Sequence, residues 1–199
     1  MNGVGFMELM DQGGPVMWVI FVVAWVAFIL LCERTLRVIA WRKSAAQAQR
    51  ELQGTKDDTL PKGHSPIAQI VAALDWSQIK KRQDLAEHMS IQLSELMPRM
   101  EGSLPTIAVL GSLLPMLGLL GTVMGMIEVF HVIALHGTGD PQQMADGISQ
   151  ALLTTASGLI IAIPVIFFHH LLVRELRSII SVTEQSMHAV YIRYESRLD

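Results

Sequence analysis

The basic residues of this 199-residue chain are confined to two blocks, and this distribution constrains the fold more than any other feature. Eleven of the fifteen Lys and Arg residues lie between Arg34 and Arg99, four lie between Arg174 and Arg197, and the rest of the chain has none. Two basic-free zones result, 1–33 and 100–173. Because 51% of the residues are hydrophobic and only 17% are charged, these zones predict segments that lie in a bilayer.

Three apolar segments in these zones are long enough to cross a membrane. The first, 16–32, would be about 25 Å long as a helix, near the lower limit for a span. The second zone holds 104–135 and 147–173, separated by a polar turn over 136–146. The sequence therefore predicts an all-α polytopic membrane protein with three transmembrane helices, whose long second and third helices extend into the cytoplasm. Glu8 and Asp11 argue against a cleaved signal peptide, which needs a basic start.

The basic blocks also predict the orientation. Residues 1–15 and the turn 136–146 carry no Lys or Arg, so the positive-inside rule places them on the outer side. Segments 33–103 and 174–199 then lie in the cytoplasm. Within 33–103, Ser65-Pro66 is typical of a helix start, and apolar residues at helical spacing from Leu85 to Met100 predict a packed helix. The residues after 173 predict a C-terminal cytoplasmic helix.

Small residues form stripes on the second and third spans. The stripe on the second span consists of Gly111, Pro115, Gly118, Thr122 and Gly125, with Gly121 also available for packing; that on the third consists of Gly147, Ala151, Thr155, Gly158 and Ala162. Spacings of three and four place each stripe along one helical face. In a bilayer such faces let helix backbones approach closely, so these residues are predicted to pack helices together.

Polar residues on the third span form a second face. Gln150, Thr154 and Ser157 lie at i, i+4 and i+7, whereas an ideal helix sets Gln150 and Thr155 about 140° apart. One of these two could face a lumen and the other a neighbouring helix, or the lumen could be wide. Each hydroxyl could also simply bond to its own helix.

Charged side chains are scarce within the predicted spans. No acidic or basic group lies in the middle of any span, since Glu128 is close to the outer turn. If the chain conducts protons, the titrating carboxylate must come from a partner. A single cysteine, Cys32, and the lack of protease, hydrolase or phosphate-loop motifs predict no catalytic residues, no metal and no cofactor. A net charge of −3 disfavours nucleic acid as a partner.

Two longer motifs carry a family resemblance. Leu113-Leu-Pro-Met-Leu-Gly-Leu-Leu-Gly-Thr-Val-Met-Gly125 and the stretch from Gly147 to Pro164 closely resemble the MotA/TolQ/ExbB proton-channel family, with the ExbB branch as the best match. The resemblance is strongest over 95–173. The family's frequent glutamate in Gly-Ile-x-Glu-Ala-Leu is Gln150 in this chain, so a carboxylate role cannot be carried over to that position.

The resemblance implies a function. ExbB-like subunits form a homo-oligomeric ring, a pentamer, in the bacterial inner membrane, surrounded by membrane lipid. The ring encloses single helices of an ExbD-like partner, whose aspartate binds the proton, and it works with a TonB-like protein to power siderophore-type uptake. The N-terminus and the 136–146 turn would be periplasmic. Thr122 and Thr155 would line the proton path, with Gln150, Thr154 and Ser157 as further lining residues. A TolQ-like role in outer-membrane constriction and a passive membrane scaffold are the alternatives.

Overall fold

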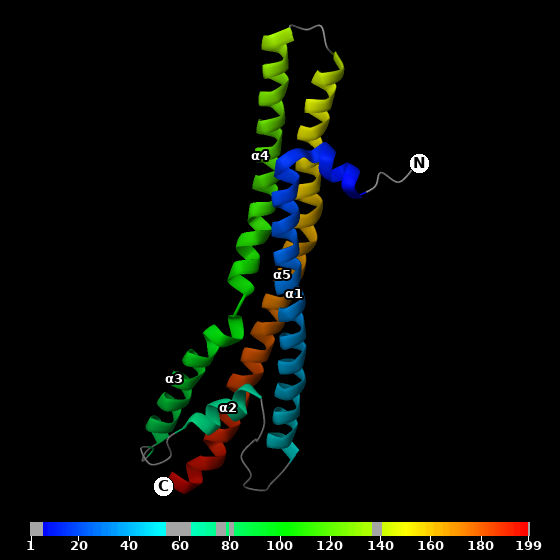
Figure 1. The fold of residues 1–199 in the computed structure, drawn as a ribbon. Helices are drawn as coiled ribbons and strands as arrows, with labels where there is room; N and C mark the ends of the chain where they lie inside the picture. Colours follow the sequence, from blue (N-terminus) through cyan, green and yellow to red (C-terminus); the bar gives the residue numbers. More distant parts are fainter. Residues whose placement is uncertain (1–5, 55–64, 75–78, 80–81, 137–140, 199) are drawn as a thin grey trace. The chain divides into compact units, whose positions relative to one another are not determined.

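The computed structural model describes residues 6–54, 65–74, 79, 82–136 and 141–198, and within these residues all regular structure is helical. Five helices follow one another along the chain (Figure 1): α1 (Phe6–Gly54), α2 (Pro66–Ala73), α3 (Arg82–Glu101), α4 (Leu104–His136) and α5 (Pro141–Leu198). The all-α prediction is confirmed. Three helices of the described part are long and apolar enough to cross a membrane.

The observed helix bounds differ from the predicted segments at several of their ends. The first predicted span, 16–32, lies inside the 49-residue helix α1, which continues through Gly54. The second begins at Leu104, as predicted for its segment, and ends at His136. Residues 141–146, expected in a turn, are helical, because Pro141 has the backbone φ that a first helical position needs. Residues 137–140 of that turn lie outside the described residues.

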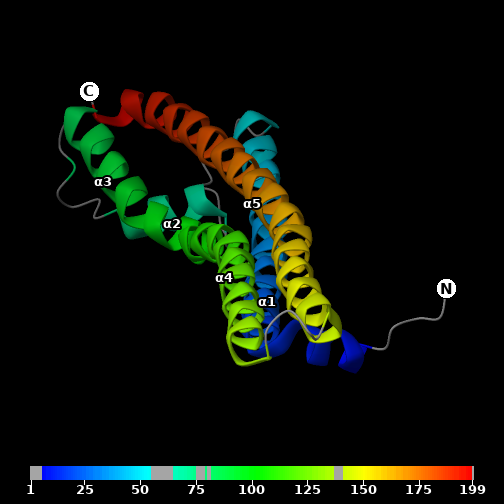
Figure 2. The same cartoon turned by 90° about the horizontal axis from the view of Figure 1, so that it is seen from above.

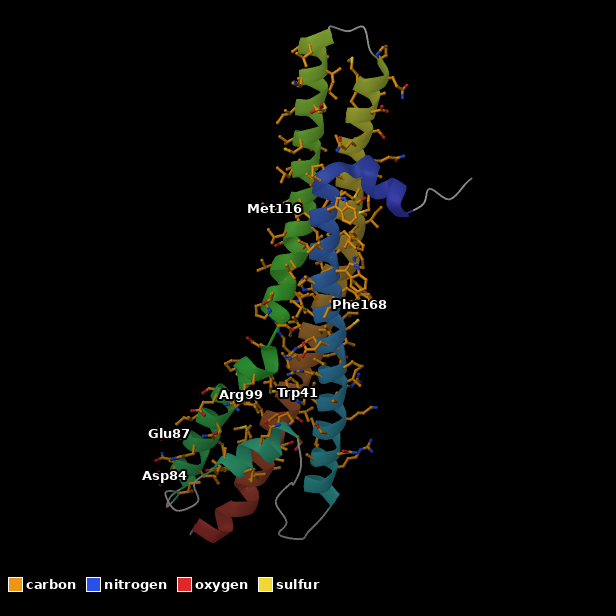
Figure 3. All side chains as sticks on the ribbon, viewed as in Figure 1. Trp41, Asp84, Glu87, Arg99, Met116 and Phe168 are labelled. Carbon is orange, nitrogen blue, oxygen red and sulfur yellow. The ribbon has the colours of Figure 1, made fainter. Side chains whose placement is uncertain are left out.

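The chain divides into two compact units. Unit 1 comprises residues 1–32 and 105–169, and unit 2 comprises residues 33–104 and 170–199. In unit 1, parts of α1, α4 and α5 run side by side in two perpendicular views (Figures 1 and 2). Most large apolar side chains of this unit remain exposed, including Met116 at 65% and Phe168 at 53% (Figure 3). Such surfaces are compatible with lipid or with other membrane helices rather than with water.

Unit 2 has its own hydrophobic core. The short helix α2 is buried along most of its length and packs with α3, together with Ala48 of α1 and Val190 of α5. The hydroxyl of Ser65 accepts the N–H of Ala68 at 3.2 Å, so the predicted Ser65-Pro66 helix start is confirmed. On α3, Leu85 and Met89 are at most 1% exposed, which confirms the predicted apolar stripe of 85–100.

A buried arginine lies against the break between α3 and α4. Gly102 has φ 47°, and its N–H donates to the carbonyl of Pro98 at 2.9 Å, which is a left-handed glycine cap. A Cβ at Gly102 would lie 2.7 Å from Nη1 of Arg34. That arginine is 1% exposed, and its guanidinium lies 5.1 Å from the ring of Trp41. The sequence predicted the side of the membrane on which Arg34 lies but not its burial at this junction.

Candidate functional site

Helices α4 and α5 meet along a seam of glycines in unit 1. A Cβ at Gly158 would lie 2.6 Å from the carbonyl oxygen of Leu114, and a Cβ at Gly118 would lie 3.0 Å from the Cα of Thr155. A Cβ at Gly125 would be 2.8 Å from both Ala151 and the carbonyl of Gly147. Because most of these neighbours are backbone atoms, the two helices cannot accept side chains there at the same separation.

Other predicted packing residues lie on the same seam. Gly111 faces Val165 and Ile166, with the nearest side-chain carbon 3.0 Å from its ideal Cβ position. Gly147 faces Val129 across the seam, and Ala162 is 2% exposed. Six of the predicted packing residues thus face the other helix across the contact between α4 and α5, and the seventh, Ala162, is buried; the six are Gly111, Gly118, Gly121, Gly125, Gly147 and Gly158.

The seam coincides with each predicted stripe except at one or two positions, where it is displaced by one residue. On α4 it passes through Leu114 and Gly121, both buried, whereas Pro115 and Thr122 are half-buried on its flank. On α5 the fully buried side chain is that of Thr154, whereas the side chain of Thr155 is half-buried beside it. Helical spacings of three and four alternate, so both sets of positions share Gly111, Gly118 and Gly125. Residue size alone does not predict which of the two sets faces the other helix, because the large Leu114 contributes its backbone carbonyl to the contact.

Thr154 lies in the interior of this contact. Its Oγ1 donates to the carbonyls of Ala151 at 2.9 Å and Gln150 at 3.1 Å on its own helix. A Cβ at Gly121 would overlap this hydroxyl. Thr154 is therefore packed between the two helices, with its hydrogen-bonding capacity directed back along α5.

Thr122 and Thr155 lie together on the flank of the seam. The Oγ1 of Thr155 donates across the helices to the carbonyl of Gly118 at 2.9 Å. In an α-helix that carbonyl also accepts the N–H of the residue four positions later, which is Thr122. The Thr122 hydroxyl donates to the carbonyl of Leu119 at 2.6 Å. Both threonines are half-buried. The two hydroxyls, one from each helix, therefore donate to adjacent carbonyls, those of Gly118 and Leu119, near the middle of α4.

Gln150 contacts a different helix. A Cβ at Gly14 of α1 would overlap the side-chain amide nitrogen of Gln150. Gln150 and Ser157 are both half-buried, and a separation of seven residues places them on the same side of α5. Within this chain Gln150 contacts α1 and Thr155 contacts α4, and which of the two faces a lumen stays a prediction. The role of Gly14 was not predicted, although the run Gly13-Gly14-Pro15 is a strong helix-breaking signal.

Acidic residues are scarce around this hydroxyl pair. Glu128 of α4 is exposed and lies six residues beyond Thr122. In the described residues no group of three or more His, Cys, Asp or Glu side chains could hold a metal ion. The site can therefore offer neutral hydrogen-bond donors and acceptors, and a titrating group would have to be supplied by another chain.

Comparisons with known proteins identify the family. The sequence model described as the MotA/TolQ/ExbB proton channel family matches residues 58–185. The biopolymer transport protein exbB1 of Vibrio cholerae is 31% identical over 177 residues, covering 80% of this chain and 75% of that protein. The biopolymer transport protein ExbB of Neisseria gonorrhoeae is 24% identical over 215 residues, covering 95% of this chain and 96% of that protein.

A TolQ protein is also similar over a shorter stretch. The Tol-Pal system protein TolQ of Pseudomonas aeruginosa is 36% identical over 86 residues, which cover 43% of this chain and 37% of that protein. The family match spans more than half of the chain and includes both helices of the glycine seam. This chain is an ExbB-like member of the MotA/TolQ/ExbB proton channel family.

Proposed function

We propose that this chain is the channel subunit of an inner-membrane motor that uses the proton-motive force to energise transport across the outer membrane. Its relatives are named biopolymer transport proteins, which supports a role in an energising system. An ExbD-like single-span protein would supply the proton-binding aspartate, and a TonB-like protein would carry the work to siderophore-type receptors. The basic blocks support a periplasmic N-terminus and 136–146 segment, with a cytoplasmic C-terminus.

The pair of threonine hydroxyls at the adjacent Gly118 and Leu119 carbonyls is the observation that carries this proposal. Thr122 and Thr155 occupy the flank of the seam, with exposed Leu119 and Val123 beside them, so another helix can lie against both. Holding a carboxylate ionised at this depth costs several kcal/mol unless polar groups solvate it. Hydroxyls provide this solvation without the fixed charge of Arg or Lys, which would trap the ion.

Each hydroxyl can turn toward a partner without leaving a buried acceptor unpaired. When the Thr155 hydroxyl leaves the Gly118 carbonyl, the N–H of Thr122 still donates to it. The Leu119 carbonyl, which accepts the Thr122 hydroxyl, likewise retains the N–H of Val123. Because a net hydrogen bond contributes about 0.5–1.5 kcal/mol, exchanging one acceptor for another is close to neutral. The pair can therefore bind and release a carboxylate repeatedly.

A ring of subunits would convert this exchange into work. One elementary charge moved through 100 mV corresponds to about 2.3 kcal/mol. We propose a pentamer around two partner helices, an arrangement in which the two helices cannot meet identical surroundings. Protonation of one partner aspartate then favours rotation of the ring to its next position. Thr154 supports the α4–α5 seam behind the path, and Ser157 lies on the side of α5 that Gln150 occupies.

Hydroxyl removal tests the proposed path. Thr122→Val and Thr155→Val preserve side-chain shape but remove the donor, and Thr106→Val is the matched control at an exposed position at the start of α4. Losing a hydrogen bond to a charged group costs about 1.5–3 kcal/mol, so proton flux should fall roughly tenfold or more in the first two variants. All three should assemble normally. Wild-type flux in both Thr122→Val and Thr155→Val would contradict a hydroxyl-lined path.

Partner identity tests the physiological role. Purification of the tagged chain from its own host should recover a small single-span protein with a membrane aspartate, and native mass spectrometry should give the subunit number. Loss of siderophore-type uptake on deletion would support the ExbB-like role, whereas a defect in outer-membrane constriction would indicate the TolQ-like role. A stable complex with no proton flux under any condition would indicate a passive scaffold.

A further inference from the structure

The start of helix α1 is broken at one glycine. Gly14 has φ 64° and ψ −165°, which is non-helical, and Pro15 follows it. Glycine is the residue that adopts this φ without strain, and proline suits the first position of the helix that resumes. The turns before the break are directed away from the rest of α1 (Figure 2). Met10 and Gly13 in these turns are nevertheless buried, so the segment is packed.

Gln150 of α5 fills the space beside this break. A Cβ at Gly14 would overlap the amide nitrogen of Gln150 and would lie 3.1 Å from its Cδ. Gly14 is therefore required both by its backbone conformation and by the side chain packed against it. The contact lies entirely within unit 1, so it joins two helices of one compact part of the chain.

The chemistry of the amide suits a broken helix end. Carbonyl groups of the last turn before a break have no helical N–H partner, and Pro15 brings no N–H of its own. A glutamine amide can donate as well as accept, whereas an ionised glutamate can only accept. An ionised carboxylate beside such unpaired carbonyls would be repelled by them. A neutral amide is thus matched to the break at Gly14.

We propose that Gln150 is a positioning residue that fixes the Gly14 break of α1 against α5, and that it does not lie on the proton path. This inference goes beyond the proposed function and changes one expectation drawn from the sequence, which placed Gln150 with the path-lining threonines. The contact with Gln150 of α5 then holds the first turns of α1 in position. A change at Gln150 then acts on the proton path only through the arrangement of these helices.

Thiol labelling of the first turns of α1 tests the proposal. The reporter is Gln12→Cys, at an exposed position, in the full complex in which Cys32→Ser removes the native thiol. The probe is a membrane-impermeant maleimide. Gln150→Met keeps the size of the side chain but lacks its donors, and Gln142→Met is the matched control at an exposed position of the same helix. Gln150→Met should raise the labelling rate roughly threefold or more, because it removes one polar contact that restrains movement of the first turns of α1 away from α5. Gln142→Met should leave the labelling rate unchanged.

The Gln150→Glu variant tests whether hydrogen-bond donation by the side chain, rather than its size, holds the break in position. Near neutral pH its ionised carboxylate should raise the labelling rate as Gln150→Met does, and at a pH low enough to protonate it the rate should return toward wild type, because a protonated carboxyl can donate. Labelling that equals wild type in Gln150→Met and Gln150→Glu at every pH would overturn the proposal. Since labelling needs no proton flux, this result is independent of the hydroxyl-path experiment.

Discussion

Adding one methyl group to the glycine seam should separate α4 from α5, and Gly158→Ala is the sharpest such change. The new Cβ would lie 2.6 Å from the Leu114 carbonyl oxygen and 3.2 Å from the Cα of Gly118. Both neighbours are backbone atoms, so relief requires movement of a helix rather than rotation of a side chain. Gly111→Ala makes a useful contrast, because its nearest neighbours are side-chain carbons of Ile166 and Val165 at 3.0 and 3.3 Å.

The magnitude follows from opposing effects. Overpacking a tight interior costs about 1–3 kcal/mol. A wider seam would also lengthen the 2.9 Å bond from Thr155 to Gly118, which contributes about 0.5–1.5 kcal/mol. Alanine is favoured over glycine within a helix by up to about 1 kcal/mol. Gly158→Ala should therefore lower the free energy of unfolding by roughly 1–3 kcal/mol, and Gly111→Ala by less than about 1 kcal/mol.

Unfolding of the purified protein in mixed micelles, titrated with a denaturing detergent, measures this difference. Ala156→Val serves as the control, since it adds more bulk at an exposed position two residues from Gly158. The expected order of destabilisation is Gly158→Ala, then Gly111→Ala, then the control. Equal or greater stability of Gly158→Ala relative to wild type would refute the conclusion that backbone contact sets the helix separation.

Three further changes test unit 2 by the free energy of unfolding. Ser65→Ala should cost about 0.5–2 kcal/mol, because the N–H of Ala68 loses its acceptor; a cost equal to that of an exposed Ser90→Ala would count against the cap. Gly102→Ala should cost about 1–2 kcal/mol through its φ of 47° alone, and more through contact with Arg34, whereas an unchanged value would disprove the junction geometry. Arg34→Ala should be less stable than Arg34→Met by about 2 kcal/mol or more, since methionine retains the packed stem, and the reverse order would show that packing of the stem does not stabilise the junction.

Much of the fold follows from the sequence because the bilayer and helical periodicity impose strong patterns. The basic-free zones predicted three apolar helices, and Ser65-Pro66 predicted the start of α2, where hydroxyl capping and a missing N–H act locally. The spacing of small residues also predicted that glycines of α4 and α5 lie on faces that pack against another helix. These features depend on residues close in sequence, or on the solvent that surrounds the chain.

Contacts between distant residues were not predictable in the same way. Spacings of three and four fit both Thr122 and Gly121, and which of them faces the seam depends on how α4 is rotated about its own axis against α5. The burial of Arg34 needs the Gly102 break, 68 positions away, and Gln150 meets Gly14 from a different helix. Such partners are brought together by tertiary packing, which no local pattern records.

Proton flux into liposomes tests the central claim most directly. The chain would be reconstituted alone, with its single-span partner, and with a partner whose membrane aspartate is replaced by asparagine. A dye trapped inside reports flux under an imposed potential. Flux that requires the partner, and that disappears with the asparagine variant, is the predicted result. Full flux through the chain alone would contradict the claim that its hydroxyls serve an acid supplied by another protein.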